Sequence, residues 1–187
     1  MKLILGSKSP RRPELLKELG FEFEIRTKET DESFPEQLQV EEVASFIATK
    51  KAEALLTSLN NDEVILCADT VVTIDNCILG KPHSREHAVE MLSQLSGRVH
   101  QVITGVHITS LEKSMGFSVQ TKVHFHPLSG SMIDYYIDTF EPFDKAGAYG
   151  IQEWIGHAAV KRIEGSYTNV VGLPTHETFE ALQKFMK

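Results

Sequence analysis

Asp69 and Thr70 stand in the middle of an apolar stretch, residues 64–74, that reads Val-Ile-Leu-Cys-Ala-Asp-Thr-Val-Val-Thr-Ile. The stretch is rich in β-branched residues and has polar residues at both ends, which predicts a strand buried on both faces. A carboxylate inside such a strand costs on the order of several kcal/mol unless a cation or hydrogen bonds compensate its charge. Asp69 is therefore a candidate for catalysis or metal binding. The alternative is a structural carboxylate that caps a loop or pairs with one buried arginine.

The N-terminal turn carries groups that bind anions. Residues 3–5 predict a short strand, and a helix follows with Ser9 as its N-cap and Pro10 at its first position. The free N–H groups and the dipole of a helix start attract negative charge. Polar and basic side chains of the same turn add to this effect, namely Ser7, Lys8, Ser9, Arg11 and Arg12. We interpret the turn as a triphosphate site without Walker spacing; the alternatives are a solvated basic turn and a DNA-binding arm.

Two lysines are placed to compensate the charge of Asp69. Residues 40–55 carry apolar side chains at helical spacing, and Lys51 falls on the inward stripe of that helix. Lys81 follows the Asp69 strand after a turn, where it can reach back over the same edge. We interpret Lys51 as a functional partner of Asp69. The alternative is a lysine whose stem covers apolar surface while its ammonium group reaches water.

Composition and charge bound the kind of protein. A chain of 187 residues with 41% hydrophobic residues can bury a core, and we expect one domain over residues 1–187 with two lobes. The net charge of -7 argues against a general nucleic-acid binder, which needs a basic face. No apolar run suits a membrane span or a signal peptide. We therefore expect a cytoplasmic protein in which Cys67 and Cys77 stay reduced.

The C-terminal part of the chain adds two expectations. Residues 144–152 are rich in small side chains, which allows close approach of the backbone to a ligand. The last helix is expected to bury Phe179, Leu182 and Phe185.

The motifs taken together resemble one known family. Ser7-x-Ser9-Pro10-Arg11-Arg12 after a first strand resembles the signature of the Maf family, the nucleotide pyrophosphatases once known as septum-formation inhibitors. The resemblance continues in order through Asp31-Glu32, Lys51-Ala52, Ala68-Asp69-Thr70, Gly80-Lys81-Pro82, residues 144–152, Gly165-Ser166-Tyr167 and residues 170–174. It implies an α/β fold like that of the inosine-triphosphate pyrophosphatases, with an elongated mixed sheet, flanking helices and two lobes around a central cleft.

The reaction that this family performs fits the candidate residues. Hydrolysis of a nucleoside triphosphate between its α- and β-phosphates needs cations on the phosphate oxygens, a bridging metal ion, and a carboxylate for the attacking water. Arg12, Lys51 and Lys81 supply the cations. Glu32 and Asp69 can hold Mg²⁺ or Mn²⁺, because hard cations take oxygen ligands. No cysteine or serine stands beside a plausible base, so we expect no covalent intermediate.

The resemblance also implies individual roles. Asp69 occupies the position of the family's proton acceptor, and its role as base or metal ligand stays open. Glu32, Lys51 and Lys81 are catalytic candidates, and substrate-binding candidates are Ser7, Ser9, Arg11, Arg12, Thr70 and Gln152. Arg12, Thr70 and Gln152 match the family's specificity positions, and residues 147–152 resemble the dTTP/UTP branch. The branch that acts on 7-methyl-GTP carries a carboxylate at that last position, whereas a carboxamide matches the 4-oxo and N3–H groups of uracil or thymine.

Three functions from different classes remain open at this point. The first is a house-cleaning pyrophosphatase that converts dTTP or UTP to monophosphate and pyrophosphate. The second is a nucleotide-sensing regulator of cell division with little catalytic activity, and the third is a nucleic-acid binder, which the acidic charge disfavours. The expected partner is a nucleoside triphosphate, with no nucleic acid and no membrane; a homodimer is left open.

Overall fold

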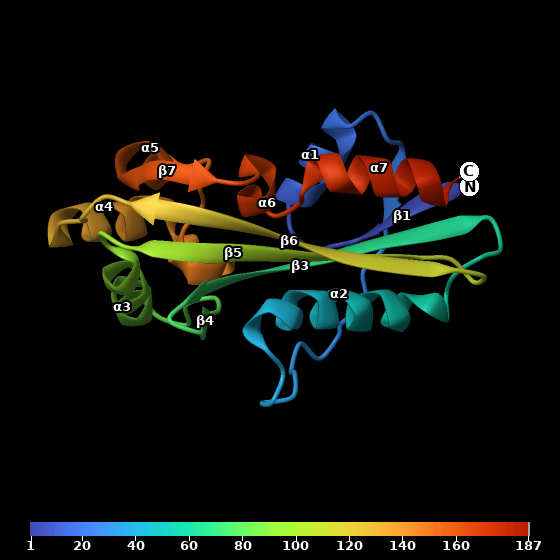
Figure 1. Ribbon diagram of the computed structural model, residues 1–187, viewed down its shortest axis with the longest axis horizontal. Coiled ribbons are helices and arrows are strands. Elements are labelled where there is room, and N and C mark those ends of the chain that lie inside the picture. Colours follow the sequence, from blue (N-terminus) through green and yellow to red (C-terminus); the bar gives the residue numbers. More distant parts are fainter. Residues whose placement is uncertain (187) are drawn as a thin grey trace. The chain divides into compact units, whose positions relative to one another are not determined.

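Seven strands form one mixed sheet in the computed structural model, which describes residues 1–186 (Figure 1). The strands are β1 (Lys2–Gly6), β2 (Phe23–Ile25), β3 (Glu63–Ile74), β4 (Cys77–Leu79), β5 (Val99–Thr109), β6 (Ser114–Phe125) and β7 (Val160–Glu164). Their order is β2-β1-β3-β5-β6-β7, and β4 pairs with β3. Strand β1 is parallel to β2 and β3, whereas β4 is antiparallel to β3 and β7 is antiparallel to β6.

The described residues divide into two compact units, each drawn from separate parts of the chain. The first unit comprises Met1–Thr70, Thr104–Val119 and the described part of Gly172–Lys187. The second unit comprises Val71–Ile103 and Gln120–Val171. Strands β3, β5 and β6 therefore each contribute residues to both units.

Helices cover both faces of the sheet in the first unit. These helices are α1 (Arg11–Glu18), α2 (Val40–Leu56) and α7 (Thr175–Phe185). Helix α2 lies on one face, and α1 and α7 lie on the other (Figure 1). Helix α2 packs Ala52 and Leu55 against Ile65 of β3. Gly105 of β5 allows this close packing, because a Cβ atom there would lie 2.3 Å from the backbone nitrogen of Ser45 in α2.

The strand predicted around Asp69 is confirmed. Strand β3 runs from Glu63 to Ile74, and its residues before Asp69 are buried without a break. Parallel pairing with β1, from Leu3 opposite Val64 onward, explains why this part of the strand reads as a continuous apolar run. Asp69 and Thr70 are partly exposed and directly follow the buried apolar residues of the strand.

The second unit holds its own apolar core, to which parts of β3, β5 and β6 contribute. Its helices are α3 (Arg85–Leu95), α4 (Gly130–Phe140), α5 (Trp154–Ala159) and α6 (Tyr167–Val171), with 3₁₀ turns η1 (Pro142–Asp144) and η2 (Ala146–Ala148). Leu92 of α3, Tyr136 of α4 and Tyr149 belong to one buried cluster. Ser84 caps α3 by accepting a hydrogen bond from the backbone nitrogen of His87.

Two details of the sequence reading are wrong. Helix α1 begins at Arg11 with Pro10 as its N-cap, one residue later than expected, and no side chain caps it. The hydroxyl of Ser7, not that of Ser9, accepts a hydrogen bond here, from the backbone nitrogen of Ser9. Phe179 of α7 is exposed and its ring lies tilted against that of Phe21, whereas Leu182 is buried as expected.

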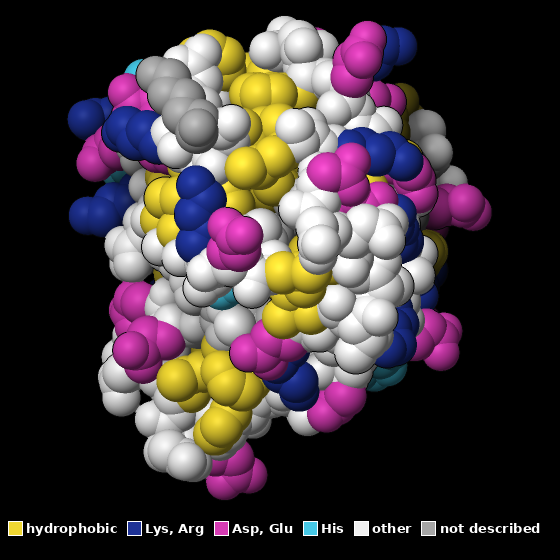
Figure 2. Space-filling model, turned by 90° about the vertical axis from the view of Figure 1, so that its right-hand side faces the viewer, with side chains coloured by type: hydrophobic (Ala, Val, Ile, Leu, Met, Phe, Trp, Pro, Cys, Tyr) yellow, Lys and Arg dark blue, Asp and Glu magenta, His cyan; other side chains and the backbone are white. Residues whose placement is uncertain are grey.

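The surface, the helices and the cysteines can be compared with what the composition of the sequence predicts. Basic, acidic and hydrophobic side chains are interspersed across the face drawn in Figure 2. Within residues 1–186, no helix has both the length and the apolar character that a membrane span requires. Cys67 is buried and Cys77 is exposed, and neither takes part in a disulfide.

Candidate active site

Lys51 joins the two carboxylates that the sequence singled out. Its Nζ atom lies 2.6 Å from Asp69 Oδ1 and 2.7 Å from Glu32 Oε1. Lys51 comes from α2, Asp69 from β3 and Glu32 from the loop before α2, so three separate segments of the first unit converge here. The side chains of Lys51 and Asp69 are 19% and 14% exposed, whereas Glu32 is half exposed. The cluster is therefore open on the side of Glu32.

Arg12 is buried beside this cluster and is held by three acceptors. Its Nε atom donates to the carbonyl oxygen of Gly172 at 2.8 Å, Nη1 to Ser7 Oγ at 3.3 Å, and Nη2 to Thr70 Oγ1 at 3.1 Å. Thr70 Oγ1 also lies 2.9 Å from Thr104 Oγ1. Burial lowers the pKa of the Arg12 guanidinium, and the negative charge of Asp69 opposes that shift. Arg12 thus fixes α1 against β3 next to Asp69.

The rest of the N-terminal turn is more open. Ser7 is buried, Ser9 and Arg11 are partly exposed, and Lys8 is exposed with its Nζ atom 3.7 Å from Glu29 Oε1. Pro10 stands at the N-cap of α1 and forms no side-chain cap hydrogen bond. The N–H groups of the first turn of α1 and the basic side chains around them can neutralise phosphate oxygens.

Lys81 and Gln152 belong to the second unit, and both are exposed. Lys81 follows β4, and Gln152 stands just before α5. A hydrogen bond from the backbone nitrogen of Gly147 to the carbonyl oxygen of Gly80, 3.0 Å long, joins the two segments that carry them. The structure therefore brings together Glu32, Lys51, Asp69, Arg12, Thr70 and Ser7 in the first unit, and links the segments of Lys81 and Gln152 in the second.

Sequence reasoning missed a buried polar cluster next to Gln152. Lys145 is buried, and its Nζ atom lies 2.7 Å from Asp144 Oδ1 and 3.1 Å from Glu153 Oε1. The hydroxyl of Tyr136 donates to the other oxygen of Glu153. The one available signal was the adjacent charged pair Asp144-Lys145 at the start of a segment rich in small side chains.

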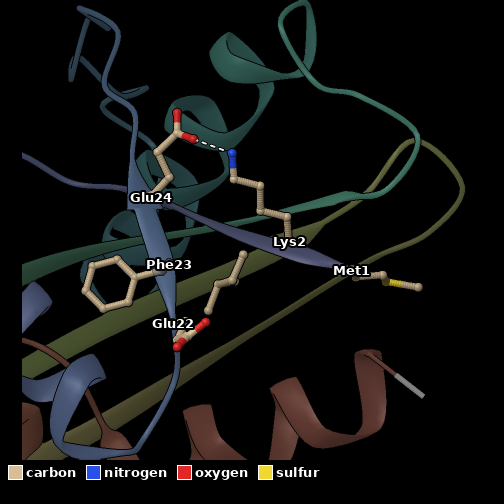
Figure 3. Close-up of a pocket in the computed structure, with 6 residues that line it drawn as sticks. Met1, Lys2, Glu22, Phe23 and Glu24 are labelled. Atoms are coloured by element: carbon tan, nitrogen blue, oxygen red, sulfur yellow. Dashed lines mark hydrogen bonds and ion pairs between the residues drawn. The ribbon is translucent and has the colours of Figure 1, made fainter.

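A cavity of about 320 Å³ lies elsewhere in the first unit, along β1 and β2 (Figure 3). Its lining includes Phe23 together with Lys2 and Glu24, which form an ion pair of 2.5 Å. None of the predicted site residues lines it, and its second glutamate, Glu22, adds negative charge. A triphosphate does not suit such a lining.

The donor set suits a divalent cation that is shared with a substrate. Glu32 and Asp69 both contact Lys51 Nζ, so their carboxylates belong to one cluster. Among residues 1–186, no group of three or more His, Cys, Asp and Glu side chains could hold a metal ion. Mg²⁺ characteristically binds through one or two carboxylates and completes its shell with water and phosphate oxygens. Two carboxylates are thus sufficient for a cation that binds with a triphosphate.

Comparison with known proteins now identifies the family. The family model for Maf-like proteins matches residues 2–185, so the chain belongs to the Maf family. It is 48% identical to the dTTP/UTP pyrophosphatase of Phocaeicola vulgatus, over 98% of this chain and 95% of that protein. It is 46% identical to the dTTP/UTP pyrophosphatase of Parabacteroides distasonis, over 98% of this chain and 96% of that protein.

The fold has a counterpart among solved structures. The structure of the Staphylococcus aureus Ham1 protein aligns with a TM-score of 0.50 and 13% identity, over 67% of this chain and 72% of that one. The expected class, a mixed α/β sheet flanked by helices, is confirmed by the strand pairing and by this likeness.

Proposed function

We propose that this protein hydrolyses dTTP and UTP to the nucleoside monophosphate and pyrophosphate. The observation that carries the proposal is the Glu32–Lys51–Asp69 cluster. In it the carboxylate of Asp69 is oriented by the ammonium group of Lys51, and the cluster is exposed to solvent on the side of Glu32. Relatives that are nearly half identical over almost their whole length bear the name dTTP/UTP pyrophosphatase. The proposed setting is the cytoplasm, because nucleoside triphosphates are intracellular and both cysteines are free.

Asp69 acts on the attacking water in the proposed mechanism. One of its oxygens receives a hydrogen bond from Lys51, which orients the carboxylate before substrate arrives. Asp69 accepts a proton from the water, and the water oxygen bonds to the α-phosphorus. The bond between the α-phosphorus and the bridging oxygen breaks, and pyrophosphate leaves with that electron pair.

Cations neutralise the charge that gathers on the phosphate oxygens. Lys51 has three donors and uses two on Asp69 and Glu32, so a further donor can face a phosphate oxygen. Arg11 and the N-terminal end of α1 supply further positive charge, and Lys81 is a further proposed cation. Mg²⁺ or Mn²⁺, held by Glu32 and Asp69, would supply additional neutralisation of the triphosphate.

The selection of the base rests on Arg12, Thr70 and Gln152. Arg12 and Thr70 are hydrogen-bonded to each other, which fixes the direction of the threonine hydroxyl. Gln152 is exposed, and its carboxamide offers one acceptor and a donor to the 4-oxo and N3–H groups of uracil or thymine.

Incubation with a panel of nucleoside and deoxynucleoside triphosphates tests the proposal. We expect release of pyrophosphate, with dTTP and UTP giving the highest kcat/KM. In ¹⁸O water the label should enter the monophosphate, because water attacks the α-phosphorus. Label in orthophosphate or pyrophosphate alone would reject the mechanism, and binding of dTTP without any pyrophosphate would favour a nucleotide-sensing regulator instead.

A further inference from the structure

The residue after Gln152 belongs to a buried polar network. Glu153 accepts a hydrogen bond from Tyr136 with one carboxylate oxygen and lies 3.1 Å from Lys145 Nζ with the other. Lys145 is 9% exposed and is also paired with Asp144. Buried ion pairs of this kind add little stability over well-packed apolar residues, because both charges lose their hydration. Buried charged groups can instead favour one conformation of the backbone around them.

The network closes on the backbone of Gly150. The Gly150 nitrogen donates to the Tyr136 hydroxyl at 3.0 Å, and the Glu153 nitrogen donates to the Gly150 carbonyl oxygen at 3.0 Å. A side chain at Gly150 would press on the network, since a Cβ atom would lie 3.0 Å from Glu153 Cδ and 3.1 Å from Lys145 Cε. The carboxylate and the ammonium group thus enclose the backbone two residues before Gln152.

Two further contacts hold the same segment. Tyr149 is buried, and its hydroxyl lies 2.7 Å from Nε2 of His100, a buried residue of β5. Gly147 donates to Gly80, which precedes Lys81. Residues 145–153 are therefore fixed at several points by partners distant in sequence, whereas the side chain of Gln152 stays exposed. An exposed amide on an immobilised backbone can form hydrogen bonds of fixed direction with a nucleotide base, and this is what discrimination between bases requires.

We propose that the network of Tyr136, Glu153 and Lys145 positions the backbone that carries Gln152 and so sets the base selectivity of the enzyme. The inference rests on the proposed function, because Gln152 must read the base for its position to matter. These three are positioning residues and do not touch the substrate. A network that served stability alone would lower the activity toward every base by the same factor.

Tyr136→Phe tests the proposal with little change in packing. The ring of Tyr136 stacks on Phe140 at 5.3 Å between centroids, and phenylalanine retains that contact while losing the hydroxyl. We expect the ratio of kcat/KM for dTTP to that for dCTP to fall by about 5-fold or more, the effect of one lost hydrogen bond on positioning. Glu153→Gln provides a second variant that keeps the shape and removes the charge facing Lys145. Tyr135→Phe is the matched control, because Tyr135 is exposed on the same helix.

Hydrogen exchange separates this inference from the proposed function. In the protein without substrate, the amides of residues 147–152 should exchange faster in Tyr136→Phe than in the wild type or in Tyr135→Phe. Unchanged exchange there would overturn the positioning role even if the wild-type protein hydrolyses dTTP. Faster exchange with an equal loss of activity for all bases would also overturn it, because the selectivity would then come from elsewhere. Absence of pyrophosphate release by the wild type would instead reject the proposed function.

Discussion

Lys51 Nζ lies 2.6 Å from Asp69 Oδ1, so the ammonium group of a helix is fixed against the carboxylate of a buried strand. The same ammonium group lies 2.7 Å from Glu32. Removing water from a charged cluster strengthens its interactions, and both Lys51 and Asp69 are largely shielded from solvent. The pair is therefore oriented before any substrate binds, which is the condition for an efficient acid–base group.

Asp69→Asn should abolish most of the activity and keep the fold. The amide is nearly isosteric with the carboxylate, yet it cannot accept the proton of the attacking water. We expect kcat to fall by roughly 10²-fold or more, the scale of a lost general base. Steady-state release of pyrophosphate from dTTP measures the loss, and a thermal melt checks the fold. Asp62→Asn, an exposed site just before β3, should leave kcat unchanged; wild-type turnover by a folded Asp69→Asn protein would contradict the role.

Lys51→Met should lower kcat/KM for dTTP by about 10²- to 10³-fold, the usual effect of removing one preorganised donor from a developing negative charge. Methionine retains the apolar stem on α2 but leaves Asp69 and Glu32 without their shared cation. The matched control is Lys50→Met on the same helix. Lys50 pairs with Asp31 and the carbonyl oxygen of Ser33, outside the Asp69 cluster. Equal losses in both variants would mean that Lys51 contributes only positive charge near the site, and that its contacts with Asp69 and Glu32 do not matter for catalysis.

The contact between Lys51 and Asp69 could be predicted from sequence because a helical pattern and a strand pattern each place one of the two residues. Helical spacing placed Lys51 on the buried face of α2, and the apolar run of β3 placed Asp69 where its charge needs a partner. The same physics failed at α1. Ser9 has the preferred residue type for an N-cap, but Ser7 and Arg12 form the local hydrogen bonds instead, and Pro10 takes the cap position.

Other contacts between distant segments could not be predicted from the sequence. Arg12 donates to the carbonyl oxygen of Gly172, 160 residues away, and any residue can offer a carbonyl oxygen. Tyr136 lies in α4, whereas Lys145 and Glu153 lie between regular elements, and no spacing in the sequence links the three side chains. Sequence spacing cannot show that these three side chains enclose Gly150, because that depends on how α4 packs against the following turns.

The ion pair of Glu63 and Arg26 should make stability depend on pH. Hydrogen bonds from Arg26 and from the backbone nitrogen of Asn60 lower the pKa of Glu63 from 4.5 to about 2. A carboxyl group whose pKa is lowered on folding stabilises the protein above its unfolded pKa. This contribution is complete above pH 4.5 and is lost as the pH falls toward 2. Thermal melts across this range should show a fall in the melting temperature.

Glu63→Gln isolates that contribution. The variant should melt at a lower temperature than the wild type at pH 7, and the difference should shrink as the pH falls from 4.5 to 2. Glu18→Gln, at the exposed end of α1, is the control and should follow the wild-type curve. Curves for Glu63→Gln and wild type that stay parallel over this range would show that Glu63 does not titrate with folding.

Gln152→Glu should weaken the use of dTTP and UTP without affecting stability. The side chain is exposed, so the change leaves the core intact. A carboxylate has only acceptors, and it repels the 4-oxo group of thymine or uracil where the amide would donate to it. We expect kcat/KM for dTTP and UTP to fall by an amount worth ~1–3 kcal/mol, the penalty for an unpaired polar group at a binding site. A guanine base, with its N1–H and N2–H₂ donors, should lose less or gain. Gln120→Glu on β6 is an exposed control of the same chemistry. An equal loss for every base would mean that residue 152 contributes charge alone and does not read the base.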